Sequence, residues 1–386
     1  MKKLCGTYDF LNIRLIITHK SDYKFNYLNI IKYRFNYIQI IICFIRFCDY
    51  FCDKLNHLNV NHMKCISLTL ALFLSLCSFL CQAQILPVEE QAVVLNTKEG
   101  DIKGKLLLPD EGKVWPVVLL IAGSGPTDMD GNSAVGNMKN NSLKFLAEGL
   151  AKNGIASLRF DKRGIASSAA AGKEEVKLRF EDYVNDVIGW IDYLAKDRRF
   201  TGITVVGHSE GSLIGMLACK DRPKVKGFVS LAGAGRPAYE LIEIQVAAQK
   251  LPEAMLKEVA SINESLKGGK EVTDVPVYLQ SLFRASVQPY LISWYKYNPQ
   301  TIIAALKVSV LIVQGKTDIQ VSVEDAELLK KACPAARFLL IDRMNHVLKD
   351  CDVTDQQQQL AVYTNPSLPV NTILISSVSS FIKKPK

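Results

Sequence analysis

The chain has 386 residues, of which 48% are hydrophobic and 22% charged, and a formal net charge of +9. These proportions are typical of a globular protein and exclude wholesale disorder. Residues 1–83 carry ten Lys or Arg and four Asp or Glu, a net charge of +6 that leaves only +3 for the remainder. The balance gives no indication of a nucleic-acid partner.

Residues 1–62 differ in composition from the rest of the chain. They contain no Ala, Pro or Glu, and 35 of the 62 are Ile, Asn, Tyr, Phe or Lys. This amino-acid composition is typical of translated AT-rich DNA. We interpret the segment as a non-native N-terminal extension that arises from an error in the gene start, and we take Met63 as the true start.

Residues 63–83 have the layout of a cleavable signal peptide. Lys64 supplies a short basic region, Ile66–Cys81 is an apolar stretch without charges, and Ala83 precedes the expected cleavage site. Sixteen residues are few for a membrane-spanning helix. We therefore expect a secreted or periplasmic protein with no stable membrane partner after cleavage. The alternative is a protein anchored in the membrane by residues 64–81.

Three cysteines remain beyond the expected cleavage site. Pairing of Cys333 with Cys351 is left open, and Cys219 has the character of a small core residue. No Cys/His cluster is present in this part of the sequence, so we expect neither a metal nor another cofactor.

From residue 91 onward, strand-like and helix-like segments alternate. Val117–Ala122 is apolar throughout, as a strand buried on both faces requires. Leu143–Lys152 and Phe180–Lys196 have apolar residues at helical spacing. Strands separated by helices need crossover connections, so we predict an α/β fold with a mostly parallel sheet covered on both sides. The expected strands are 92–96, 102–108, 117–122, 155–160, 203–206, 225–231, 308–313 and 338–341.

Residues 236–298 interrupt this alternation. The segment is helical in pattern, with soft breaks at Lys267–Lys270 and Asp274–Pro276, and it is rich in aromatic residues towards its end. We expect residues 91–235 and 299–384 to form the core and residues 236–298 to form a helical cap.

Gly207–Gly211 matches the motif G-x-S-x-G, with Ser209 at its centre. A strand precedes the motif and an apolar helix follows it, which is the context of a nucleophile elbow. Small residues on both sides are needed because the chain turns sharply and approaches itself closely. We predict Ser209 to be the nucleophile.

The base that activates Ser209 follows by elimination. Three of the five histidines precede the expected signal peptide, and His208 neighbours the nucleophile, where it is expected to support the elbow. His346, just after the strand at 338–341, remains and is predicted to be the general base.

Asp318 is the predicted acid. It stands in Gln314–Asp318, directly after a buried strand, and functional groups collect at the carboxyl ends of parallel strands. The order Ser, Asp, His is that of α/β-hydrolases. The alternative candidates for the acid are Asp342, Asp350 and Asp352, which we interpret as solvated loop carboxylates.

A tetrahedral intermediate needs hydrogen-bond donors for its oxyanion. The N–H of Glu210, next to the nucleophile, is one predicted donor. The glycine-rich loop after the strand at 117–122 offers the N–H of Ser124 as the other. Asp128, Asp130 and Asn132 follow in the same loop. We interpret them as loop-capping residues because the rest of a calcium-loop pattern is missing.

Together these motifs resemble the successive signatures of the α/β-hydrolase superfamily, and in particular bacterial carboxylesterases of the serine-aminopeptidase-like branch. The resemblance rests on Ala122–Asp128, Phe160–Gly164, Gly207–Gly211, Gln314–Asp318 and Asn345-His346, and it runs from about residue 91 to 382. It implies that Asp161 and Arg163 fix the loop beside the site, and that residues 236–298 form a variable cap over the pocket.

We therefore expect a serine hydrolase that cleaves carboxylic esters of small molecules through an acyl-enzyme. A serine aminopeptidase or amidase that acts on short peptides with the same triad is the alternative, for which Glu240, Glu243 or Glu253 would hold the peptide N-terminus. Four aromatic residues near the C-terminal end of the expected cap are expected either to line the substrate pocket or to pack in the core of the cap. They are Phe283, Tyr290, Trp294 and Tyr297.

Overall fold

The computed structural model describes residues 90–109 and 112–384. The segments predicted as a non-native extension (1–62) and a signal peptide (63–83) lie outside the described residues. Within the described ranges, no helix combines the length and apolarity that crossing a membrane requires.

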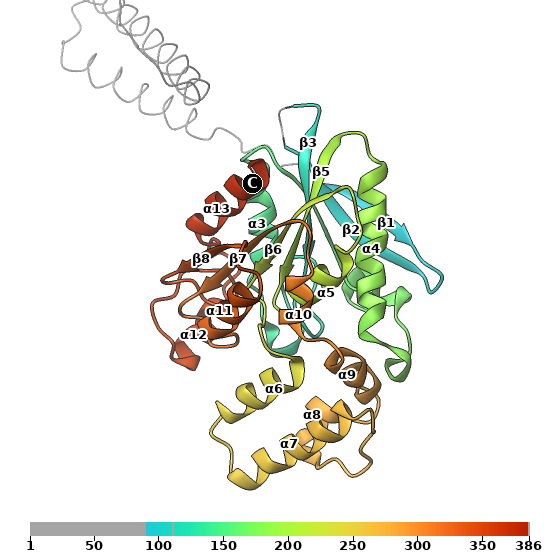
Figure 1. Cartoon of the computed structure of the whole chain (residues 1–386), viewed down its shortest axis with the longest axis vertical. Coiled ribbons are helices and arrows are strands. Elements are labelled where there is room, and N and C mark those ends of the chain that lie inside the picture. The colour runs from blue at the N-terminus through green and yellow to red at the C-terminus, as the bar shows by residue number, and fades with distance from the viewer. Residues whose placement is uncertain (1–89, 110–111, 385–386) are drawn as a thin grey trace, which may run out of the picture. The chain divides into compact units, whose positions relative to one another are not determined.

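An eight-stranded sheet runs through the described part of the chain in the order β1-β2-β4-β3-β5-β6-β7-β8 (Figure 1). The pairs β1–β2 and β2–β4 are antiparallel, and all neighbours from β4 to β8 are parallel. The predicted α/β class with a mostly parallel sheet is confirmed. The strands are β1 (Glu90–Asn96), β2 (Asp101–Leu107), β3 (Trp115–Ile121), β4 (Ala156–Phe160), β5 (Phe200–His208), β6 (Val225–Leu231), β7 (Ser309–Gly315) and β8 (Arg337–Ile341).

Helices cover both faces of the sheet. Successive side chains of β3 point to opposite faces, so Leu119 packs in one apolar core and Leu120 in the other. Helices α4, α5, α10 and α11 close the first core, and α3 and α13 close the second (Figure 1). The helices of these layers and their neighbours are α3 (Ser142–Ala151), α4 (Phe180–Lys196), α5 (Glu210–Ala218), α10 (Pro299–Ala304), α11 (Val323–Ala332), α12 (Gln356–Tyr363) and α13 (Thr372–Lys383), with 3₁₀ turns η1 (Val135–Asn137), η2 (Ala166–Ala171) and η3 (Glu175–Lys177).

Between β6 and β7 the chain forms a group of helices, here called the helical insertion (residues 236–298). Its own buried residues include Val259, Leu266 and Phe283, which continue the first apolar core. The Phe180 N–H donates to Ser293 Oγ at 2.8 Å and so ties the insertion to α4. The insertion contains α6 (Ala238–Ala247), α7 (Glu253–Lys267), η4 (Val277–Leu279), α8 (Gln280–Phe283) and α9 (Gln288–Tyr295).

The carboxyl ends of the parallel strands bring distant segments together. Ser124 follows β3, Ser209 follows β5, Asp318 follows β7 and His346 follows β8. Because parallel strands end at the same edge of a sheet, loops that are far apart in sequence meet there.

Candidate active site

Ser209 occupies a strained turn between β5 and α5. Its backbone has φ 54° and ψ −123°, outside the regions that residues with a side chain favour. A Cβ on Gly207 would overlap the Gly211 carbonyl, and a Cβ on Gly211 would lie 2.6 Å from the Ala122 oxygen. Glycine is therefore required on both sides of the turn. The turn leaves Ser209 half-buried at the start of α5.

Asp318 and His346 form a hydrogen-bonded pair. His346 Nδ1 lies 2.8 Å from Asp318 Oδ2, and the Asp318 side chain is fully buried. Burial raises the pKa of the Asp318 carboxyl, but the His346 imidazole and the N–H groups of Val321 and Gln320 lower it more, so the pKa lies below its ordinary value. An ionised Asp318 fixes the His346 ring and leaves Nε2 as the nitrogen that accepts a proton.

The loop that carries His346 is held by hydrogen bonds of Asn345 and Lys349. The Asn345 N–H donates to the Lys349 carbonyl at 3.0 Å, and the Lys349 N–H donates to Asn345 Oδ1 at 3.1 Å. Lys349 is buried, and its Nζ donates to the Asn365 carbonyl at 2.7 Å. Burial lowers the pKa of Lys349 to about 8.

His208 supports this loop from the sheet. Its Nε2 lies 2.7 Å from the His346 carbonyl oxygen, and the two rings are 4.8 Å apart between centroids. Burial lowers the pKa of His208 to about 3, so the ring is neutral at ordinary pH and donates its Nε2–H to this carbonyl. The supporting role expected for His208 agrees with this contact.

The two predicted oxyanion donors lie beside Ser209. A Cβ on Gly123 would be 3.2 Å from the Ser209 Cβ, so the loop after β3 passes directly over the nucleophile. Among the described residues, neither the Ser124 N–H nor the Glu210 N–H donates to a backbone carbonyl. Both N–H groups are thus available to a ligand at Ser209.

A cavity of about 80 Å³ contains both donors and the nucleophile. Trp294 lines it, whereas Phe283, Tyr290 and Tyr297 do not. Phe283 is buried in the insertion, and the hydroxyls of Tyr290 and Tyr297 donate to glutamates of the core. For these three residues the structure supports packing of the insertion instead of pocket lining. The cavity is lined by Ser124, Ser209, Glu210, Leu213, Ala234, Arg236, Ala238, Leu241, Ile242, Gln245, Trp294, Pro299 and Gln320.

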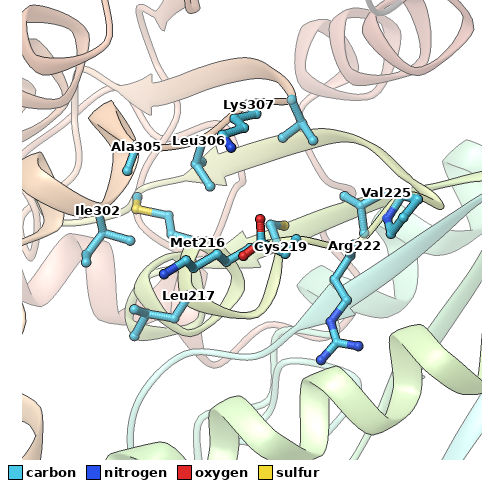
Figure 2. A pocket seen from close by; sticks show the side chains of 13 residues that line it. Met216, Leu217, Cys219, Arg222, Val225, Ile302, Ala305, Leu306 and Lys307 are labelled. Carbon is cyan, nitrogen blue, oxygen red and sulfur yellow. The ribbon is translucent and has the colours of Figure 1, made fainter.

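A larger cavity of about 830 Å³ lies at the amino ends of β6 and β7 (Figure 2). It contains none of the predicted site residues. Ligands of parallel α/β sheets bind at the carboxyl ends of the strands, so we place the active site at the smaller cavity. The larger one is lined by Met216, Leu217, Cys219, Lys220, Asp221, Arg222, Pro223, Val225, Ile302, Ala305, Leu306, Lys307 and Val308.

Lys162 is a buried residue of this region that the sequence did not single out. Its Nζ donates to the Gly123 carbonyl at 2.6 Å and lies 3.3 Å from Glu210 Oε2. The other oxygen of Glu210 accepts the Tyr290 hydroxyl at 2.6 Å. The Lys162 contacts join residues 39 and 48 positions apart, so no local pattern reveals them.

The remaining polar residues near the site have structural partners. Asp161 Oδ1 accepts the Met129 N–H at 2.7 Å, and Arg163 pairs with Asp186. Asp128 Oδ1 accepts the N–H groups of Asp130 and Asn132, which agrees with loop capping. In residues 90–109 and 112–384, no three His, Cys, Asp or Glu side chains are grouped to hold a metal, and the three cysteines are free.

Comparison with known proteins agrees with this fold. A family model described as serine aminopeptidase, S33, matches residues 137–285. Esterase EstD of Thermotoga maritima is 28% identical over 265 residues, which cover 67% of this chain and 60% of that protein. The chain thus spans less than two thirds of this relative. The structure of Est1E from Butyrivibrio proteoclasticus with bound ferulic acid superposes with a TM-score of 0.51 and 18% identity, covering 76% of this chain and 98% of that one.

The depressed pKa of His208 predicts a dependence of stability on pH. The unfolded chain takes up a proton near pH 6.5, whereas folded His208 does so only near pH 3. This stabilisation is therefore complete above pH 6.5 and is lost as the pH falls below it, by about 2 kcal/mol between pH 7 and pH 5. Denaturant unfolding of the wild type and of His208→Gln at several pH values measures it. If the free energy of unfolding changed equally with pH in the two proteins, the depressed pKa assigned to His208 would be contradicted.

The strand order and the structural comparison show that the chain has the α/β-hydrolase fold, and residues 137–285 are similar to the serine aminopeptidase (S33) family.

Proposed function

We propose that the protein is a serine hydrolase that cleaves small carboxylic esters through an acyl-enzyme. The observation that carries this proposal is the arrangement of Ser209 on a strained turn beside two free N–H groups, with a buried His346–Asp318 pair on the neighbouring strand ends. The esterase name of the Thermotoga relative supports the choice of an ester as substrate.

The reaction follows from the roles of these groups. Ser209 Oγ attacks the ester carbonyl carbon while His346 Nε2 takes the hydroxyl proton, and Asp318 stabilises the resulting imidazolium. The N–H groups of Ser124 and Glu210 donate to the oxyanion. The C–O bond to the alcohol breaks, and His346 returns its proton to that oxygen. Water then attacks the acyl carbon of acyl-Ser209 and passes a proton to His346. The bond from the acyl carbon to Ser209 Oγ breaks, His346 returns this proton to Oγ, and the acid is released with the enzyme restored.

An aminopeptidase needs an acidic group that holds the substrate's amino terminus. Glu240, Glu243 and Glu253 do not line the cavity, and Glu243 accepts a hydrogen bond from Asn263 Nδ2 at 3.1 Å. Glu210 does line it, but both of its carboxylate oxygens are already bonded to Lys162 and Tyr290. The ester is therefore the better substrate for this cavity.

Replacement of the nucleophile tests the proposal. We expect the purified protein to hydrolyse p-nitrophenyl acetate or butyrate, and Ser209→Ala to lower kcat by at least about 10⁴-fold because the covalent step is lost. Ser124→Ala is the matched control, since it removes a hydroxyl but keeps the backbone N–H, and it should retain activity within about threefold. Hydrolysis of aminoacyl p-nitroanilides without hydrolysis of any ester would favour the peptidase instead.

The size of the cavity predicts a preference for short acyl chains. A volume of about 80 Å³ is well below that of pockets for drug-sized ligands, which reach about 300–1,000 Å³. Ile242 lines the cavity, whereas Ile244 on the same helix is 46% exposed. We expect Ile242→Ala to raise the kcat/KM ratio of octanoate to acetate esters by roughly tenfold. Ile244→Ala should leave the ratio unchanged, and equal effects of the two variants would contradict the assignment of the cavity.

We also propose that residues 63–83 direct export, since they combine a basic start, an apolar stretch and a small residue before Gln84. Expression from Met63 in a bacterial host should give protein in the exported fraction whose first residue is Gln84, as determined by N-terminal sequencing. Protein that retains residues 64–81 and sediments with membranes would indicate an anchor instead.

A further inference from the structure

A buried hydrogen-bond network lies behind the two oxyanion donors, and the proposed mechanism does not use it. We call Lys162, Glu210 and Tyr290 the oxyanion network. Their side chains belong to the segment after β4, the start of α5 and α9 respectively. All three residues are buried, with exposed fractions of 2%, 7% and 8%. Of the three, only Glu210 lines the substrate cavity.

Lys162 fixes the direction of one donor through the peptide plane. Its Nζ donates to the Gly123 carbonyl at 2.6 Å. The peptide between Gly123 and Ser124 is trans and planar, so its N–H points away from its C=O. With the carbonyl held by Lys162, the Ser124 N–H is directed to the opposite side of the peptide, and Ser124 lines the same cavity as Ser209. A cation on the carbonyl oxygen also polarises the peptide and strengthens its N–H as a donor.

The same ammonium group holds the residue that supplies the other donor. Lys162 Nζ lies 3.3 Å from Glu210 Oε2, and the Tyr290 hydroxyl donates to Oε1 at 2.6 Å. An unpaired carboxylate at this position would oppose the negative charge that develops on the oxyanion. Lys162 and Tyr290 compensate the Glu210 charge and hold the first turn of α5 in place.

Tyr290 connects the helical insertion to this arrangement. Its ring lies 6.0 Å from the ring of Trp294, which lines the substrate cavity, and 5.8 Å from that of Tyr183. Lys162 Nζ in turn lies 5.0 Å from the centre of the Tyr183 ring. The insertion thus lines the substrate cavity through Trp294 and contacts the Glu210 side chain through Tyr290.

We propose that Lys162, Glu210 and Tyr290 are positioning residues that set the direction of both oxyanion N–H groups. The inference rests on the proposed function, because it assigns a role to side chains around the proposed oxyanion hole. A network that only stabilised the fold would affect the melting temperature and leave the rate of each folded active site unchanged.

The test uses the rate at which a fluorophosphonate labels Ser209. In this step the Ser209 Oγ–P bond forms, His346 takes the hydroxyl proton, the P–F bond breaks with loss of fluoride, and the oxyanion donors bind the phosphoryl oxygen. The double variant Lys162→Met/Glu210→Gln leaves no uncompensated buried charge and so keeps the fold measurable. We expect its labelling rate constant and its kcat for p-nitrophenyl acetate, per labelled site, to fall about 100-fold while KM changes by less than about threefold.

Two single variants on α9 form a matched pair. Tyr290→Phe removes the hydroxyl that binds Glu210, and Tyr295→Phe removes an equally buried hydroxyl that donates to Asn263 at 2.7 Å. Tyr290→Phe should slow labelling by about tenfold, and Tyr295→Phe by less than about twofold. A folded double variant that labels at the wild-type rate, or equal effects of the two tyrosine variants, would overturn the proposal. Absence of labelling in the wild type, or labelling of Ser209→Ala, would instead reject the hydrolase itself, and the positioning role with it.

Discussion

The backbone at Ser209 is held in a conformation that the chain adopts only under close packing from both sides. Gly211 lies against the Ala122 carbonyl, and Gly207 lies against Gly211. The turn therefore depends on the pairing of β5 with β3 on one side and β6 on the other, and on the packing of α5 against the sheet. Since the positive φ of Ser209 costs about 1–3 kcal/mol, the apolar cores on both faces of the sheet must supply the stability that maintains it.

The buried carboxylates near this turn each have a polar partner. Asp318 is buried beside His346, and Glu210 is buried beside Lys162, so each of the two buried carboxylates near the nucleophile has a hydrogen-bonding partner. Asp318 orients the base His346, and we infer that the Glu210–Lys162 pair directs the oxyanion donors. Buried charges of this kind are costly without partners, which explains why each carboxylate oxygen of Glu210 has one. The helical insertion participates because Tyr290 supplies one of these partners.

The sequence predicts the fold well, for reasons that are local. The run 117–122 is apolar at every position because β3 is buried on both faces, and the glycines around Ser209 are forced by the turn. The sequence does not reveal Lys162, because its partners at 123 and 210 are brought close only by the sheet order. Aromatic residues of the insertion are equally ambiguous: Phe283 and Trp294 look alike in sequence, yet one fills the interior and the other lines the cavity.

The proposed mechanism requires the oxyanion of the tetrahedral intermediate to lie beside the N–H groups of Ser124 and Glu210. A crystal structure of the protein after reaction with a phosphonate ester measures this directly, since the phosphoryl oxygen occupies the oxyanion position. We expect phosphorus bonded to Ser209 Oγ and that oxygen about 2.7–3.1 Å from the N atoms of Ser124 and Glu210. An adduct on another residue, or a phosphoryl oxygen that faces solvent with neither N–H in reach, would contradict the account.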